Sequence, residues 1–136
     1  MSTLAEGRSA SVLVIDDQPF FTNMLRGALE QQGFRVLVAN SGADGLASAK
    51  KNVPDVILLD IEMPVMDGFV VCEQLQKDDA VKHIPIVILT ATNNPKLNER
   101  AFKAGADIVA LKVLSTEKLV NMIRLAIGKG KAAPPA

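Results

Sequence analysis

Residues 55–60 read "DVILLD", an unbroken run of four large aliphatic side chains between two aspartates. A strand with one solvent-exposed face alternates apolar and polar residues, whereas a strand covered on both faces is apolar throughout. Three other stretches have the same continuous pattern: "SVLVI" at 11–15, "IPIVIL" at 84–89 and "DIVAL" at 107–111. The sequence therefore predicts buried parallel strands at the centre of an α/β fold.

A fifth strand and a first helix extend this pattern. "FRVLVAN" at 34–40 alternates more and carries Arg35, which suits the edge of a sheet. Pro19 marks the first turn of a helix after the first strand, and Gly33 is placed to end it. We expect this helix to have an apolar face made of Phe20, Met24, Leu25, Ala28 and Leu29.

Further helices begin at residues that favour helix N-termini. The side-chain oxygens of Ser41, Asp67, Asn94 and Ser115 are placed to cap four of them. Gly68 is expected to supply a backbone conformation that other residues resist. Five βα units in succession imply right-handed crossovers and a doubly wound five-stranded parallel sheet, in the flavodoxin-like order 2-1-3-4-5.

The composition excludes several kinds of protein. The predicted domain covers residues 11–128, after a disordered lead at 1–10 and before a flexible tail or linker at 129–136. Basic and acidic residues balance at 15 each, which argues against direct binding to nucleic acid. The single cysteine, Cys72, rules out an internal disulfide, and no apolar run approaches the ~20 residues of a membrane helix. We therefore expect a cytoplasmic protein that does not associate with membranes.

Polar side chains follow the four central strands of the predicted sheet. Because ligands of open α/β sheets bind beyond the carboxyl ends of the strands, these side chains should converge in one crevice. Each alone is an ordinary turn or cap residue, but three clustered carboxylates repel one another and one lysine cannot neutralise them, which predicts a bound Mg²⁺. The residues are Asp16 and Asp17 after the first strand, Asp60 after the third, Thr90 after the fourth and Lys112 after the fifth.

Four motifs carry a family resemblance: "VLVIDDQ", "DVILLDIEMPVMDG", "IPIVILTA" and "GADIVALK". Over residues 11–128 the chain resembles the CheY-like receiver domains of bacterial response regulators, the phosphoacceptors of two-component signalling. The resemblance implies that Asp60 becomes an aspartyl phosphate. It also implies that Thr90 hydrogen-bonds the phosphoryl group and that Lys112 pairs with it. The implied Mg²⁺ ligands are Asp16, Asp17, Asp60 and the main-chain carbonyl of Glu62.

The resemblance also implies partners. The phosphoryl donor would be a histidine kinase or a histidine phosphotransfer protein of a phosphorelay, docking on residues 18–30. The signal would leave through the face of residues 94–127 to a downstream protein or effector domain. Glu62 and Thr92 would form the rim of the site and tune the lifetime of the phosphoryl group. No dedicated catalysis on small molecules is expected, only self-phosphorylation and slow autodephosphorylation.

Two residues depart from the family pattern. Val109 stands where receivers commonly carry an aromatic residue, and Val113 stands where a proline commonly follows the lysine. In the family a hydroxyl like that of Thr90 moves toward the phosphoryl group and the aromatic ring fills the vacated space, so the Thr90 and Val109 pair cannot switch in this way. Because a cis bond before a non-proline residue costs about 3 kcal/mol, we expect the Lys112–Val113 peptide to be trans.

Three alternative functions are open. A flavodoxin would need a Ser/Thr- and Gly-rich loop for the flavin phosphate, where this chain has "DDQPF" at 16–20. A haloacid-dehalogenase-type phosphatase also uses an aspartyl phosphate, and "DIE" at 60–62 loosely matches its motif, but that motif belongs on the first strand of a longer chain. A pseudo-receiver would keep the fold as a phosphorylation-independent interaction module, and Val109 and Val113 favour it.

Overall fold

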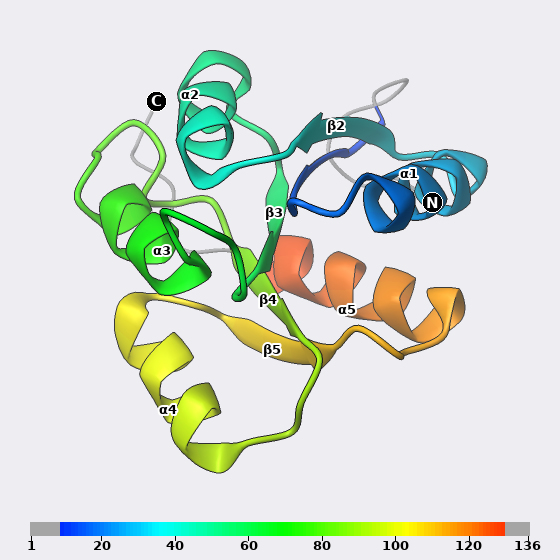
Figure 1. The fold of residues 1–136 in the computed structure, drawn as a ribbon. Coiled ribbons are helices and arrows are strands. Elements are labelled where there is room, and N and C mark those ends of the chain that lie inside the picture. Colours follow the sequence, from blue (N-terminus) through cyan, green and yellow to red (C-terminus); the bar gives the residue numbers. More distant parts are fainter. Residues whose placement is uncertain (1–8, 130–136) are drawn as a thin grey trace.

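The computed structural model describes residues 9–129, which form five parallel strands flanked by five helices (Figure 1). The order in the sheet is β2-β1-β3-β4-β5, which confirms the predicted topology. In chain order the elements are β1 Ser11–Ile15, α1 Pro19–Gln31, β2 Arg35–Ala39, α2 Gly42–Asn52, β3 Val56–Asp60, α3 Gly68–Gln76, β4 Ile86–Thr90, α4 Pro95–Ala104, β5 Ile108–Leu111 and α5 Thr116–Lys129.

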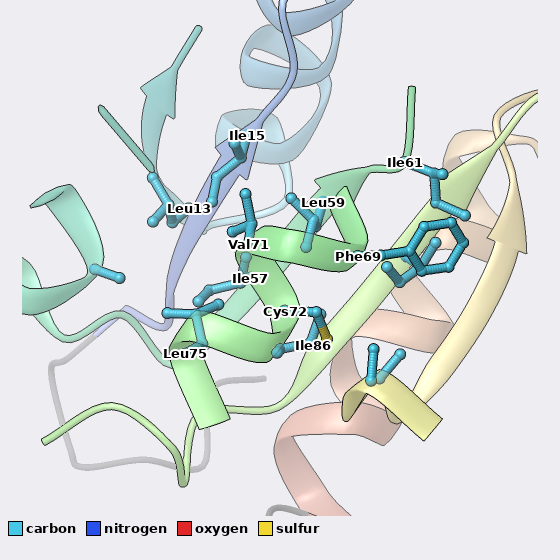
Figure 2. Close-up of a cluster of buried hydrophobic side chains, with 14 of the residues drawn as sticks. Leu13, Ile15, Ile57, Leu59, Ile61, Phe69, Val71, Cys72, Leu75 and Ile86 are labelled. Atoms are coloured by element: carbon cyan, nitrogen blue, oxygen red, sulfur yellow. The ribbon is translucent and has the colours of Figure 1, made fainter. Parts of the chain in front are cut away.

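The sheet separates two apolar layers. Leu13, Ile15 and Leu59 point to one side, where they pack against α2, α3 and α4 (Figure 2). The neighbouring residues Val12 and Val14 point to the other side and pack against α1 and α5. Both faces of the central strands are therefore covered, which is why their sequences are continuously apolar. Figure 1 shows the same division, with α2, α3 and α4 on one side of the sheet and α1 and α5 on the other.

The predicted helix beginnings are confirmed. The backbone N–H of Asp44 donates to Ser41 Oγ over 3.1 Å, that of Val70 to Asp67 Oδ1 over 3.0 Å, and that of Lys96 to Asn94 Oδ1 over 3.0 Å. These side chains satisfy N–H groups that have no partner within their own helix. The backbone N–H of Lys118 likewise donates to Ser115 Oγ over 3.3 Å.

The predicted apolar face of α1 is partly wrong. Leu25 and Leu29 are buried, but Phe20 is 85% exposed and Met24 is 52% exposed. The buried stripe instead includes Thr22, whose hydroxyl donates to the carbonyl of Pro19 over 3.0 Å. Phe20 and Met24 are four residues apart and lie one above the other on an adjacent stripe, which faces away from the sheet.

Smaller differences concern the ends of elements. β4 begins at Ile86, because Pro85 has no N–H to donate to the ladder. The helix α5 extends past Gly128 to Lys129, and residues 1–8 and 130–136 of the predicted lead and tail lie outside the described residues. Between residues 9 and 129 there is no cis peptide bond, so the Lys112–Val113 bond is trans as expected.

The parallel strands give the sheet two distinct edges. We call the segments that follow the strands the carboxyl edge, and those that precede them the amino edge. The carboxyl edge comprises 16–18, 40–41, 61–67, 91–94 and 112–115 together with the strand ends Asp60 and Thr90, and the amino edge comprises 9–10, 32–34, 53–55, 84–85 and 105–107.

Candidate functional site

Three aspartates meet at the carboxyl edge. Asp16 follows β1 directly and Asp60 is the last residue of β3, the strand that pairs with β1. One carboxylate oxygen from each of Asp16, Asp17 and Asp60 lies within 4.8 Å of the others. Asp16 is 1% exposed and Asp60 is 2% exposed, while Asp17 is half-buried. The predicted convergence of these carboxylates is therefore present in the fold.

Lys112 enters this acidic cluster from β5. Its Nζ lies 2.9 Å from Asp16 Oδ2 and 3.3 Å from Asp60 Oδ1, and it donates to Gln18 Oε1 over 3.4 Å. The ammonium also lies 4.7 Å from the centre of the Phe21 ring, within range of a cation–π interaction. The sequence interpretation missed Gln18 and Phe21, because neither residue type marks a site without knowledge of what lies beside it.

The electrostatics of the cluster perturb its ionisable groups. The pKa of Asp60 is raised from 3.8 to about 6. Burial is the largest cause and the charge of Asp16 adds to it, whereas Lys112 and the Glu62 N–H act in the opposite direction. Burial alone would lower the pKa of Lys112, but its interactions with Asp16 and Asp60 outweigh burial, and the pKa is raised. The cluster is thus short of positive charge while Lys112 remains protonated.

The donor set fits a hard divalent cation. Three carboxylates supply oxygen ligands, and Mg²⁺ is bound by one or two carboxylates while it keeps several waters. Lys112 supplies one positive charge against three negative charges, so a second cation would relieve the repulsion that raises the pKa of Asp60. Of the other predicted ligand, Glu62, the backbone N–H donates to Asp60 Oδ1 over 3.3 Å and the side chain is exposed.

The hydroxyl of Thr90 belongs to the same edge but is bonded to its own loop. It donates to the carbonyl of Thr92 over 3.2 Å and accepts from the Thr92 N–H over 3.2 Å. Thr90 is buried, whereas Thr92 and Glu62 are exposed. Val109 is half-buried and packs on the α4 side of the sheet.

Gly68 shapes the site by close approach. Its φ is not positive, so the expectation of a special backbone conformation is wrong. A Cβ at this position would lie 2.5 Å from the carbonyl oxygen of Asp60 and 2.7 Å from Ile61 Cα. The first turn of α3 thus packs directly on the backbone that carries Asp60, which only glycine allows.

Comparison with known proteins fits this geometry. The family model described as "Response regulator receiver domain" matches residues 12–124. The chain is a response regulator receiver domain. It therefore belongs to two-component signalling, and its five-stranded fold is that of CheY-like receivers.

Individual relatives differ in length. The receiver is 36% identical to Protein PilH of Pseudomonas aeruginosa, covering 84% of this chain and 94% of PilH. It is 33% identical to the DNA-binding dual master transcriptional regulator RpaA of Synechocystis, covering 92% of this chain and 52% of RpaA. The solved structure of Vibrio cholerae chemotaxis protein CheY4 superposes with a TM-score of 0.84 at 30% identity, over 88% of this chain and 99% of CheY4. The chain thus spans nearly all of some relatives and about half of others.

Among the helices of residues 9–129, none combines the length and the apolar composition that crossing a bilayer requires.

Proposed function

We propose that this receiver is a phosphorylation-dependent switch that accepts a phosphoryl group on Asp60 in the cytoplasm. The observation that carries the proposal is the position of Asp60. It is buried at the end of β3, forms an ion pair with Lys112 and lies beside Asp16 and Asp17. The phosphoryl donor is a phosphohistidine of a histidine kinase or of a histidine phosphotransfer protein.

The chemistry is a displacement at phosphorus. A carboxylate oxygen of Asp60 forms an O–P bond while the N–P bond of the phosphohistidine breaks, and the imidazole leaves with the electron pair. Lys112 then pairs with the transferred group, and the hydroxyl of Thr90 turns from Thr92 to donate to it. Asp16, Asp17, Asp60 and the main-chain carbonyl of Glu62 hold the Mg²⁺, which when bound neutralises charge on the phosphoryl oxygens. Hydrolysis of the aspartyl phosphate is slow, and Glu62 and Thr92 at the rim control the access of water.

Exposed apolar side chains lie on the segments that follow β1, β3 and β5. Phe20 and Met24 lie on α1, Val65 lies in the loop after β3, and Val113 directly follows Lys112, and all four are exposed. An apolar rim around a charged centre is typical of a protein-binding surface. This supports docking of the phosphodonor over residues 18–30, and it gives the exposure of Phe20 and Met24 a function. The downstream protein or effector domain binds the face of residues 94–127.

A pseudo-receiver is the second candidate. Val109 and Val113 favour it, because both positions differ from the pattern that the family uses for switching. In that case the same fold would bind its partner without a phosphoryl group.

The intact mass after incubation with acetyl phosphate and Mg²⁺ distinguishes the two. We expect a gain of one phosphoryl group, which EDTA prevents. Asp60→Asn should abolish the gain, because an amide is a poor nucleophile and contributes no charge to the metal site. Asp55→Asn, directly before the first residue of the same strand, is the matched control and should gain the same mass as wild type. An unlabelled wild type would favour the pseudo-receiver, and labelling of Asp60→Asn would place the acceptor elsewhere.

A further inference from the structure

A small cavity lined by Thr90 lies between the end of β4, the following loop, α4 and β5. Its volume is about 30 Å³, and its lining includes Thr90, Thr92, Asn98 and Val109. This volume is enough for about one water molecule or for a modest movement of the surrounding loop. A larger side chain at Val109 would occupy it. Val109, which stands where the family commonly has an aromatic residue, therefore leaves space beside Thr90. The hydroxyl of Thr90 is the group that moves in the proposed function.

Asn98 brings an unused hydrogen-bonding group to this cavity. It lies in the second turn of α4, and its side-chain Oδ1 is buried without a hydrogen-bond partner within residues 9–129. Buried polar groups are nearly always paired, and an unpaired acceptor destabilises the state in which it occurs. A hydrogen bond to Oδ1 therefore favours any conformation that supplies a donor over the present one.

The Thr92 peptide, in a residue that lines the same cavity, is hydrogen-bonded to the hydroxyl of Thr90. Thr90 Oγ1 bonds both the N–H and the carbonyl of Thr92, each over 3.2 Å. For an O–H···O bond this is longer than the usual 2.7–2.8 Å, so the hydroxyl is held only weakly. When it turns away, the N–H of Thr92 needs an acceptor and the carbonyl of Thr92 needs a donor.

We propose that Asn98 is a positioning residue for the loop after β4. When the Thr90 hydroxyl turns to the phosphoryl group, the side-chain amide of Asn98 replaces it as the hydrogen-bond partner of the Thr92 peptide. A side-chain amide offers both an acceptor and donors, which are the two groups that the released peptide requires. The loop of residues 91–94 moves into the cavity as Oδ1 accepts from the Thr92 N–H and Nδ2 donates to the Thr92 carbonyl. The exchange supplies the coupling that an aromatic ring at Val109 would otherwise provide. The step is triggered by phosphorylation of Asp60, and in this respect it rests on the proposed function.

The exchange moves the beginning of α4. Asn94, at the end of the same loop, accepts from the N–H groups of Lys96 and Leu97 over 3.0 and 3.4 Å. A shift of residues 91–94 therefore carries the first turn of α4 with it. The signal reaches the face of residues 94–127 through hydrogen bonds between side chains and the backbone and not through rotation of a ring.

A first experiment needs no phosphorylation. Thr90→Val removes the hydroxyl and keeps the shape of the side chain. The Thr92 peptide should therefore hydrogen-bond to the Asn98 side chain even in the unphosphorylated protein. We expect the side-chain NH₂ resonances of Asn98 and the amides of residues 92–100 to move in ¹⁵N–¹H spectra. The α4 part of this change should be lost in the double variant Thr90→Val, Asn98→Leu. If Thr90→Val leaves the Asn98 resonances where wild type has them, the inference is wrong.

A second experiment adds the phosphoryl group. Asn98→Leu keeps the branched shape with larger terminal groups and no polar atom, Asn98→Asp keeps an acceptor, and Asn93→Ala is a control at the same cavity. With acetyl phosphate and Mg²⁺ we expect all three to gain the same mass as wild type. Asn98→Leu should lose the amide shifts of residues 95–104, Asn98→Asp should retain part of them, and Asn93→Ala should keep them.

The two hypotheses fail in different ways. Wild-type shifts of α4 in a fully phosphorylated Asn98→Leu variant would overturn the role of Asn98 while leaving Asp60 as the acceptor. If wild type gains no mass, the proposed function fails, and the unphosphorylated Thr90→Val comparison decides the role of Asn98 by itself.

Discussion

The two edges of the sheet use aspartates in opposite ways. At the amino edge, Asp55 Oδ2 accepts from the N–H of Ser11 over 2.7 Å, and Asp107 Oδ2 accepts from the N–H of Ile86 over 2.8 Å. These carboxylates satisfy backbone groups at the beginnings of strands. At the carboxyl edge, Asp16, Asp17 and Asp60 face one another within 4.8 Å. The same residue type thus stabilises one edge and stores repulsion at the other, and both mutual proximity and deeper burial distinguish the carboxylates of the carboxyl edge.

Mg²⁺ should produce the largest difference between the edges. Free Mg²⁺ at 100 times its dissociation constant should stabilise wild type by about 2.7 kcal/mol through mass action. Asp17→Ala should be more stable than wild type without Mg²⁺, because one repelling charge is gone, and should respond less to Mg²⁺. Asp107→Asn at the amino edge should keep the full response. Thermal unfolding with Mg²⁺ and with EDTA measures all three, and a metal-free Asp17→Ala that melts below wild type would contradict the repulsion argument.

Neutralising one acid should change stability with opposite sign at the two edges. In EDTA at pH 7.5, Asp60→Asn should raise the free energy of unfolding by about 2 kcal/mol. This is less than the full pKa shift would give, because solvent reaches part of the site. Asp107→Asn should lower it by about 1–2 kcal/mol, because a charged hydrogen bond becomes a neutral one. Urea denaturation tests both, and the contrast fails if both variants change stability in the same direction.

The advantage of Asp60→Asn should depend on pH. The pKa of Asp60 is raised from 3.8 to about 6, so between these values the folded state holds a proton that the unfolded state lacks. The contribution of Asp60 to stability therefore falls as the pH rises through this window, and the full penalty is present above pH 6. The advantage of the asparagine over wild type in EDTA should shrink by about 1 kcal/mol from pH 7.5 to pH 5. Equal advantages at both pH values would mean that the carboxyl is already ionised at pH 5.

The smallest effect should come from the apolar rim of the carboxyl edge. Phe20→Ser and Met24→Ser replace exposed side chains, so each should change the free energy of unfolding by less than about 0.5 kcal/mol. A loss of 2 kcal/mol or more in urea denaturation would show that these residues support the fold and are not reserved for a partner.

The sequence predicted most of what depends on position along a strand. Asp16, Asp60, Thr90 and Lys112 each lie at the end of a recognisable apolar run, and parallel strands bring such ends together, so their clustering followed from topology. The strand order followed from the βα alternation in the same way. The roles of these residues in phosphoryl transfer stay predictions.

Features that depend on contacts across the fold could not be predicted. Helical periodicity placed Phe20 and Met24 on an apolar face, but it does not say which of two adjacent stripes meets the sheet. Gly68 was singled out for its backbone freedom, whereas the reason for glycine is the carbonyl of Asp60 beside it. The unpaired oxygen of Asn98 leaves no trace in the sequence, because it results from the packing of α4 over β4 and β5.

The course of α5 has a practical consequence. This 14-residue helix starts at the carboxyl edge after Lys112 and, at about 1.5 Å per residue, runs back about 21 Å toward the amino edge, from which β1 also starts. A biosensor surface or fluorophore linked through either residue 9 or residue 129 would therefore sit at the amino edge, at the opposite end of the strands from Asp60. The receiver can be immobilised by either end with its acidic cluster and apolar rim facing solution, which is the orientation that a binding measurement with a phosphodonor needs.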